Sequence, residues 1–340
     1  MNQTVTLLLP NYNGARFLRE SIPALLRQTY QHFQLIVVDN CSTDESAAVV
    51  SGFADNRISF VPHLEHVPVA GSFKRAQELV DTPFYALCAV DEVYEPEWLG
   101  TMIGLLERQP DAFFACCKID SADIDGHVYL APYERYKDSF WPQAEPALFA
   151  RDKYVAGFSK GCFLIITSGV FRASALEKIG LLDEELAFAA DWQYLIRGLL
   201  AGFTIIGTHR RLVHYRRHPN MTTNSLNADL SRFHSELAMI DWMTKAAFEQ
   251  GVINSRQPDY RIVRNTLLHE LAIYLTVRKY AYADKLLTFG IEKIPRFKGT
   301  FFHYIAWVAC RLGRNGGLAL LMAEGIYLRL RLAIREKLLP

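Results

Sequence analysis

The chain has 340 residues, half of them hydrophobic, which is enough for one large globular domain and a smaller one. Its formal net charge of +1 gives no global electrostatic case for nucleic acid as a partner, so any basic patch must be local. The six cysteines include no Cys-x-x-Cys pair and several lie in apolar runs, which favours a reducing, cytosolic compartment.

Short apolar runs alternate with helical patterns through the first half of the chain. Strands are expected at residues 5–9, 35–39, 58–61, 84–90, 113–118 and 162–167, and helices at 18–30, 72–80 and 96–108. This alternation predicts an α/β fold with a mostly parallel central sheet flanked by helices. Residues 120–154, rich in Pro, Tyr, Asp and Glu, lack periodicity and are expected to form an inserted loop.

After residue 224 the pattern changes to long helical runs at 228–249, 260–280 and 283–293. We therefore place a boundary near residue 220, between an α/β domain of residues 1–220 and a C-terminal helical region of residues 221–340. The first strand begins almost at the N-terminus, which argues against a secretory signal. The most apolar late segments, 301–310 and 318–322, are shorter than the ~20 residues of a membrane span, so no transmembrane helix is predicted.

The last segment, residues 318–339, carries four cations among leucines and isoleucines: Arg329, Arg331, Arg335 and Lys337. A basic amphipathic helix of this kind can lie on an anionic membrane surface. On a helical wheel, however, the cations are spread over more than one face. Packing on the rest of the protein or on a second subunit therefore stays open as the alternative.

Two of the expected strands deliver polar groups at their carboxyl ends. The first ends in Pro10-Asn11-Tyr12-Asn13-Gly14 and the second in Asp39-Asn40-Cys41-Ser42-Thr43-Asp44. In an open α/β sheet this edge is where neighbouring loops diverge and ligands sit. Neither loop contains Gly-x-Gly-x-x-Gly or Gly-Lys-Ser/Thr, so the usual dinucleotide and P-loop phosphate cradles are missing.

Together with the helix between them, which ends in Gln-Thr-Tyr, these motifs resemble the nucleotide-binding half of family 2 inverting glycosyltransferases of GT-A fold. The resemblance continues at intervals to about Thr223. It implies a GT-A fold in which Asp39 accepts hydrogen bonds from the base or ribose of a nucleotide sugar. The other donor-binding residues that it implies in these loops are Pro10, Tyr12, Asn13 and Asn40.

Ala89-Val90-Asp91-Glu92 ends the fourth expected strand and resembles the family's Asp-x-Asp-Asp element. In that element carboxylates hold a divalent cation against the donor diphosphate. The resemblance implies that Asp91 binds Mn²⁺ or Mg²⁺, supported by Glu92, with Val90 beside the donor. Ala89 departs from the family at the first acidic position. The chain therefore lacks a carboxylate there that could contact the ribose or strengthen metal binding.

Asp191-Trp192 resembles the family's Glu-Asp-Trp segment, with Ala190 in place of the glutamate. The resemblance implies that Asp191 is the catalytic base, a role that typically contributes ~10² to 10⁴ in rate. The alternative is a helix-start aspartate that interacts with the macrodipole. Trp192, and Gly161 in the loop of residues 157–161, would line the acceptor pocket.

Residues 214–220, His-Tyr-Arg-Arg-His-Pro-Asn, resemble a late family motif that closes over the diphosphate. It implies that His218 ligates the metal and that Arg216 neutralises phosphate with its planar guanidinium. Lys74 occupies a place where relatives face the donor, and it could contact phosphate or sugar. For all three residues, a solvated surface is the alternative.

The resemblance therefore implies a metal-dependent inverting hexosyltransferase in the cytoplasm, at the inner face of the membrane if it binds lipid. It would move a sugar from a UDP, dTDP or GDP donor to a hydroxyl of a glycan or lipid-linked oligosaccharide in cell-surface polysaccharide synthesis. The C-terminal helices are expected to contact the acceptor, a second copy or the membrane surface. Two alternatives remain. The first is a non-catalytic nucleotide-sugar-binding or scaffold subunit, because Ala89 and Ala190 replace acidic positions of the family. The second is a sugar nucleotidyltransferase, but such an enzyme needs a glycine-rich phosphate loop after its first strand, and residues 10–13 do not supply one.

Overall fold

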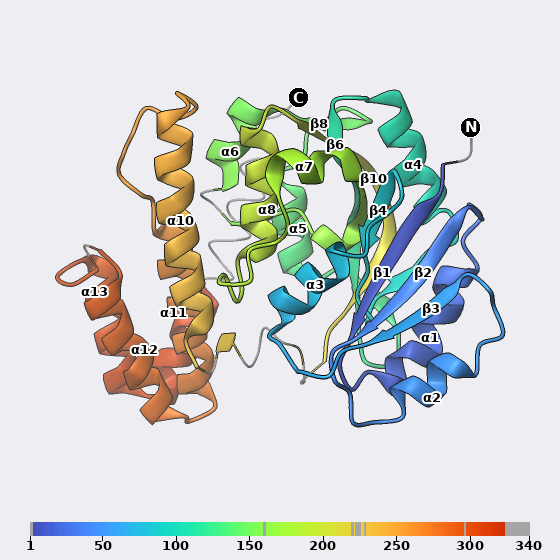
Figure 1. The fold of residues 1–340 in the computed structure, drawn as a ribbon. Coiled ribbons are helices and arrows are strands. Elements are labelled where there is room, and N and C mark those ends of the chain that lie inside the picture. The colour runs from blue at the N-terminus through green and yellow to red at the C-terminus, as the bar shows by residue number, and fades with distance from the viewer. Residues whose placement is uncertain are drawn as a thin grey trace.

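A computed structural model describes residues 3–158, 161–218, 221, 226–227, 229–295 and 297–323. Figure 1 shows an α/β body around one twisted sheet, with a group of helices on one side of it. The sheet order is β3-β2-β1-β4-β9-β6-β10-β5. These strands span Val5–Asn11 (β1), Phe33–Asp39 (β2), Ile58–Pro62 (β3), Phe84–Leu87 (β4), Val93–Tyr94 (β5), Ala112–Ala122 (β6), Gly169–Arg172 (β9) and Thr204–Arg216 (β10).

The sheet is mixed and mostly parallel, as expected. β1 runs parallel to β2 and β4, β2 to β3, and β6 to β10. β9 lies antiparallel between β4 and β6, and β5 is antiparallel to β10. Two short strands branch off this order: β7 (Val128–Tyr129) pairs with β6, and β8 (Ala147–Phe149) pairs with β10.

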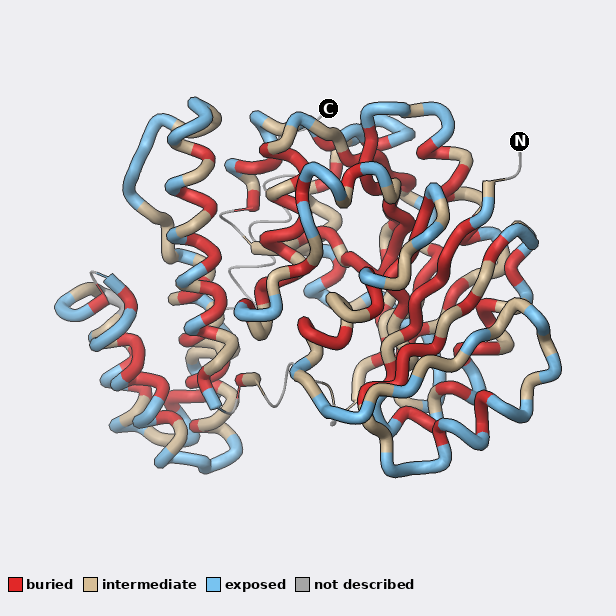
Figure 2. Tube along the Cα trace, in the orientation of Figure 1, coloured by how far each residue is buried: buried red, intermediate tan, exposed pale blue. Residues whose placement is uncertain are grey.

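Helices cover both faces of the sheet because successive residues of its central strands, which point to opposite faces, are apolar. On β1, Leu7 and Leu9 join the apolar cluster that contains α1 (Ala15–Leu26) and α4 (Trp98–Arg108), whereas Leu8 faces the cluster on the other side. That second cluster contains α3 (Val69–Gln77) and α8 (Ala190–Leu200). In Figure 2 the buried residues run along the central strands and along the sheet-facing sides of the helices. The remaining helices of this part are α2 (Ser46–Ser51), α5 (Pro132–Asp138), α6 (Arg151–Phe158) and α7 (Leu176–Ile179).

The C-terminal region is helical, as expected, with α10 (Ser231–Glu249), α11 (Arg261–Thr276), α12 (Tyr280–Lys293) and α13 (Phe301–Leu312), followed by helical residues 314–323. Its apolar residues belong to the same cluster as α8. α10 also holds the start of α8, because Ser235 Oγ accepts the backbone N–H groups of Phe188 and Ala189 at 3.1 and 3.0 Å. The boundary near residue 220, which itself lies outside the described residues, falls between β10 and α10 and stays a prediction.

Two local expectations were wrong, and one long strand was missed. Residues 162–167 do not form a strand: Ile166–Ser168 is a 3₁₀ turn, and the strand β9 begins only at Gly169. At Gly169 a Cβ would lie 1.9 Å from the Ala115 carbonyl oxygen, so the chain can approach β6 this closely only with glycine. Residues 120–154 are not a plain loop, because they contain β7, α5, β8 and the start of α6. The 13-residue strand β10 was not expected, because Arg210 and Arg211 interrupt its apolar pattern and its pairing with β6 is irregular there.

Candidate active site

The loops after β1 and β2 are joined by a hydrogen-bond network centred on Asp39, which is buried. One carboxylate oxygen of Asp39 accepts the Asn11 side-chain amide at 2.7 Å, and the other accepts the Ser42 backbone N–H at 2.9 Å. Each carboxylate oxygen has two acceptor positions, so these bonds orient Asp39 and leave capacity for a ligand. Sequence reasoning missed Asn11, although it stands at the strand end beside the predicted residues.

The neighbouring loop residues are fixed in the same way. Asn13, at φ 49°, accepts the Thr43 N–H at 2.8 Å, and Asn40 bonds the backbone of Val67 through both its amide oxygen and its amide nitrogen. Tyr12 is half-exposed and its ring centroid lies 4.2 Å from that of His66. An exposed aromatic pair beside a fixed carboxylate is a suitable surface for a planar base.

Pro10 is the penultimate residue of β1, just before this network, and is half-buried. The loop after β1 also touches the loop after β4. A Cβ at Gly14 would clash with Asn11 Oδ1 and would lie 3.3 Å from Val90 Cγ2, so glycine lets the two loops approach each other here. The predicted donor residues of these two loops therefore border one another at the carboxyl edge of the sheet.

Asp91 and His218, the two predicted metal ligands, are in contact across 127 residues of sequence. His218 Nε2 lies 3.0 Å from Asp91 Oδ2, and the His218 ring lies 5.0 Å from the Phe17 ring. The Asp91 side chain is 29% exposed and that of His218 is 8% exposed. The His218 imidazole is thus packed against Phe17, whereas the Asp91 carboxylate stays accessible to a ligand.

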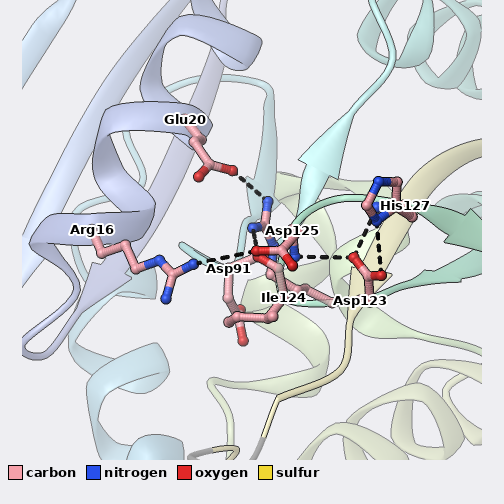
Figure 3. Close-up of polar contacts among 8 residues, drawn as sticks. Arg16, Glu20, Asp91, Asp123, Ile124, Asp125 and His127 are labelled. Atoms are coloured by element: carbon pink, nitrogen blue, oxygen red, sulfur yellow. Dashed lines mark hydrogen bonds and ion pairs between the residues drawn. The ribbon is translucent and has the colours of Figure 1, made fainter.

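Arg216, predicted to bind phosphate, is buried and uses its guanidinium within the protein. It donates to the Asp91 carbonyl oxygen at 3.1 Å, to the Ile124 carbonyl oxygen at 2.9 Å and to Glu20 Oε2 at 2.5 Å. Figure 3 shows Glu20 reaching from α1 toward the loops that carry Asp91 and Ile124. Arg216 therefore ties the Asp91 loop to α1 and to the segment after β6.

Glu92, next to Asp91, is buried and supports the same loop. It accepts the Thr167 hydroxyl at 2.8 Å and the Tyr94 hydroxyl at 3.1 Å. Burial, and then the adjacent Asp91 carboxylate, raise the pKa of Glu92 to about 8. Because its side chain is buried and both oxygens hold neighbouring hydroxyls, Glu92 supports the Asp91 loop from within the protein.

Asp191 stands in the first turn of α8 and is half-buried. Its Oδ1 accepts the N–H of Trp192 at 2.7 Å, as expected of a helix-start carboxylate. Burial nevertheless raises the pKa of Asp191 to about 6, against the opposing effects of this hydrogen bond and of the Lys137 charge. A carboxylate with a pKa near 6 can take up a proton at neutral pH more readily than an ordinary aspartate.

Tyr215 links the two halves of the site, and sequence reasoning gave it no role. Burial raises the pKa of its phenol, and the carboxylates of Glu92, Asp91 and Asp191 raise that pKa further. One phenol therefore lies within electrostatic reach of both the Asp91 loop and Asp191. Lys137 of α5 likewise acts on Glu92 and Asp191, so the supposed inserted loop supplies a cation to the site.

The other predicted site residues are Lys74, Gly161 and Trp192, and each already contacts or faces other parts of the protein. Lys74 Nζ pairs with Glu184 Oε1 at 2.5 Å, so its charge is already matched in this structure. Gly161 has φ +119° and faces Ile262 of α11. Trp192 is buried in the core, and its indole N–H has no hydrogen-bond partner among the described residues. Ser159 and Lys160 of the loop at 157–161 lie outside the described residues.

A family model for glycosyl transferase family 2 matches residues 6–180 of the chain, slightly more than half of it. The chain belongs to glycosyl transferase family 2. The resemblance seen in the sequence is thereby confirmed, and a sugar nucleotidyltransferase is set aside. Similar folds among solved structures agree with the expected GT-A architecture.

Three similar proteins illustrate the range of this glycosyltransferase's relatives. An uncharacterized glycosyltransferase of Rickettsia typhi is 24% identical over 234 residues, which cover 68% of this chain and 69% of the relative. The Escherichia coli UDP-Glc:alpha-D-GlcNAc-diphosphoundecaprenol beta-1,3-glucosyltransferase WfgD is 27% identical over 109 residues, 32% of this chain and 43% of WfgD. The mannosyltransferase PcManGT from Pyrobaculum calidifontis, solved with GDP-Man and Mn²⁺, has a TM-score of 0.54 at 14% identity and covers 95% of this chain and 86% of its own.

Two features of the described residues bear on metal and membrane binding. Within the described residues of this glycosyltransferase, no three or more His, Cys, Asp or Glu side chains gather closely enough to hold a metal ion by themselves. In the same residues, no helix is both long and apolar enough to cross a membrane.

Proposed function

We propose that this glycosyltransferase transfers a hexose with inversion from a nucleotide diphosphate donor to a hydroxyl of a glycan or lipid-linked oligosaccharide. One observation carries the proposal. The charges of Asp91, which contacts His218, and of Asp191, whose pKa is raised, both act on the Tyr215 phenol, so the two carboxylates lie within electrostatic reach of one residue. Donor-side and acceptor-side carboxylates are the two groups that a single in-line displacement requires.

The donor nucleotide would lie over the loops after β1 and β2. Asp39 would accept from the base or ribose, and the half-exposed Tyr12 would stack on the base beside His66. The contacts proposed to surround them are those of Pro10, Asn13, Asn40 and Val90. Lys74 would reach the donor only by leaving Glu184. The class of donor, UDP, dTDP or GDP, is part of what the experiment below determines.

The residues at the diphosphate end fit a divalent cation. An accessible carboxylate and an imidazole in contact match Mg²⁺ or Mn²⁺, which use one or two protein ligands and fill other positions with water and substrate phosphates. When bound, such an ion supplies electrostatic stabilisation of the departing diphosphate. Asp91 and His218 would hold it, and Arg216 would act as a positioning residue by fixing the Asp91 loop.

On the acceptor side, Asp191 would take the proton of the attacking hydroxyl. Its position is fixed by the Trp192 N–H and by α10, whose Ser235 holds the residues just before α8. Trp192, being buried, would shape the acceptor pocket from beneath, and Gly161 would line it next to α11. The C-terminal helices thus support the predicted acceptor side.

A lipid-linked acceptor is favoured by the activity of WfgD, whose acceptor is a sugar linked by diphosphate to undecaprenol. Cytoplasmic location stays a prediction that rests on cysteine usage, and a homo-oligomer stays a prediction as well. The non-catalytic alternative rests on Ala89 and Ala190, but the site retains Asp91 and a half-buried Asp191.

The test is a nucleotide-release assay over a panel of UDP-, dTDP- and GDP-sugars with Mn²⁺ or Mg²⁺, because slow donor hydrolysis can proceed without the true acceptor. Release confined to one donor and lost on chelation would support the transferase and identify its sugar nucleotide. If calorimetry detects no donor binding under any condition and no donor turns over, the scaffold alternative is favoured instead.

A further inference from the structure

The C-terminal helices carry an exposed apolar stripe that nothing in the described structure covers. On α13 the exposed side chains are Tyr304, Trp307, Val308 and Leu312, and on the following helical segment they are Leu318 and Met322. Within each helix they recur three or four residues apart, which places them on one side of it. Figure 1 shows α13 at the outer end of the molecule, on the side away from β3.

Three arginines border this stripe. Arg278, Arg311 and Arg314 line an open hollow of about 630 Å³ together with Tyr280, Cys310 and Gly313. No acidic side chain lines the hollow, and none of the three arginines forms an ion pair with a described residue. Arg311 also lies over the Trp307 ring at 4.7 Å, so the cationic hollow and the apolar stripe are continuous.

The charge of the whole segment is strongly biased. Residues 293–323 contain no Asp or Glu, and residues 293–340 hold nine of the 37 Lys and Arg but only two of the 36 Asp and Glu. The last 48 residues therefore carry a formal charge of +7, whereas the first 292 carry −6. The small net charge of the chain hides this asymmetry.

We propose that the stripe of α13 and residues 314–323 docks on a membrane surface rich in anionic phospholipid, with lipid phosphates bound in the hollow of Arg278, Arg311 and Arg314. Tryptophan and tyrosine rings prefer the interface between lipid headgroups and acyl chains, and nearby arginines are attracted to anionic headgroups. A membrane surface satisfies both features at once, and it requires no membrane-spanning helix.

A second copy of the chain fits this face less well. In a twofold dimer the same surface meets itself, so Arg311 and Arg314 would approach their own copies with no carboxylate in residues 293–323 to offset them. Anionic lipid instead supplies the opposite charge. The proposal goes beyond the proposed function, and its test uses neither donor nor acceptor.

The test is sedimentation of the full chain with vesicles of phosphatidylcholine alone, or of phosphatidylcholine and phosphatidylglycerol at 3:1. We expect binding to the anionic vesicles only, weakened by high salt. Arg311→Ala/Arg314→Ala should reduce the partition coefficient roughly 30-fold, since each surface cation contributes about fivefold. Trp307→Ser/Leu312→Ser should reduce it at least about tenfold.

Matched control variants lie elsewhere on the surface. Leu64→Ser removes an apolar side chain that is 93% exposed, and Arg108→Ala/Arg151→Ala removes one exposed and one half-buried cation. Both should bind anionic vesicles as the unmodified chain does. Failure of the unmodified chain to bind anionic vesicles, or an equal loss in the controls, would overturn the proposal. So would a dimer that Trp307→Ser/Leu312→Ser dissociates, because a second copy would then cover the stripe.

Discussion

Replacing Asp191 by asparagine should make the protein more stable and almost inactive. The amide keeps an oxygen that can accept the Trp192 N–H, but it cannot take a proton from an acceptor hydroxyl. We expect transfer to fall by ~10² to 10⁴. The gain in stability follows from the raised pKa, because burial disfavours the charged form of this carboxyl in the folded state.

The size of this gain can be worked out from the pKa. Because the folded pKa of about 6 lies above the model value of 3.8, the folded state binds the proton more tightly than the unfolded state. Stability from this group is fully present below pH 4 and is lost as pH rises through 6. At pH 8 the unmodified protein has lost up to roughly 3 kcal/mol, at 1.36 kcal/mol per pKa unit. Asp191→Asn should recover part of that at pH 8 and nothing below pH 4.

Two assays check this reasoning. Urea denaturation at pH 4 and pH 8 gives the stability difference, and kcat/KM for nucleotide release against pH gives the titration of the base. With a pKa near 6, the unmodified enzyme should retain about a tenth of its plateau rate at pH 5. A midpoint near pH 4, or an Asp191→Asn protein that is less stable at pH 8, would refute the reasoning.

Other substitutions test separate parts of the site. Asp39→Asn should weaken nucleotide binding by roughly tenfold or more in calorimetry, because one charged acceptor is lost. Arg216→Lys should lower the free energy of unfolding by about 1.5 to 3 kcal/mol and weaken Mn²⁺-dependent donor binding, because lysine cannot span the three acceptors of the arginine. Lys137→Met should move the acid limb of the pH profile to higher pH, since removal of this cation raises the pKa of Asp191; an unmoved limb would place Lys137 away from the base. Gly169→Ala should destabilise the protein by about 1 to 3 kcal/mol or more in urea, because its Cβ would meet the Ala115 carbonyl oxygen.

The sequence predicted best the parts of the fold in which local pattern and burial agree. The first two strands were placed within a few residues, since Val5–Asn11 and Phe33–Asp39 are mostly apolar and lead into polar loops. β10 could not be predicted in this way. Two adjacent arginines, Arg210 and Arg211, interrupt its apolar pattern, and it is a strand because β6 and β8 pair with it.

The candidate site shows the same division. The motifs around Asp39, Asp91 and Asp191 could be recognised because each is local in sequence. The partners of Arg216 could not, because Glu20 lies 196 residues earlier and only the fold brings it near. The contribution of Lys137 was hidden in a segment without periodicity, where tertiary packing decides the structure.

The most direct test of the central claim compares Asp91→Asn with Asp191→Asn in donor-binding calorimetry and nucleotide release under the same conditions. If the two carboxylates have separate roles, their replacement should affect donor binding and turnover differently. We predict that Asp91→Asn loses metal-dependent donor binding, whereas Asp191→Asn binds the donor with unchanged Kd and does not turn it over. Full turnover by Asp191→Asn, or unchanged metal-dependent binding by Asp91→Asn, would contradict the assignment of base and metal ligand.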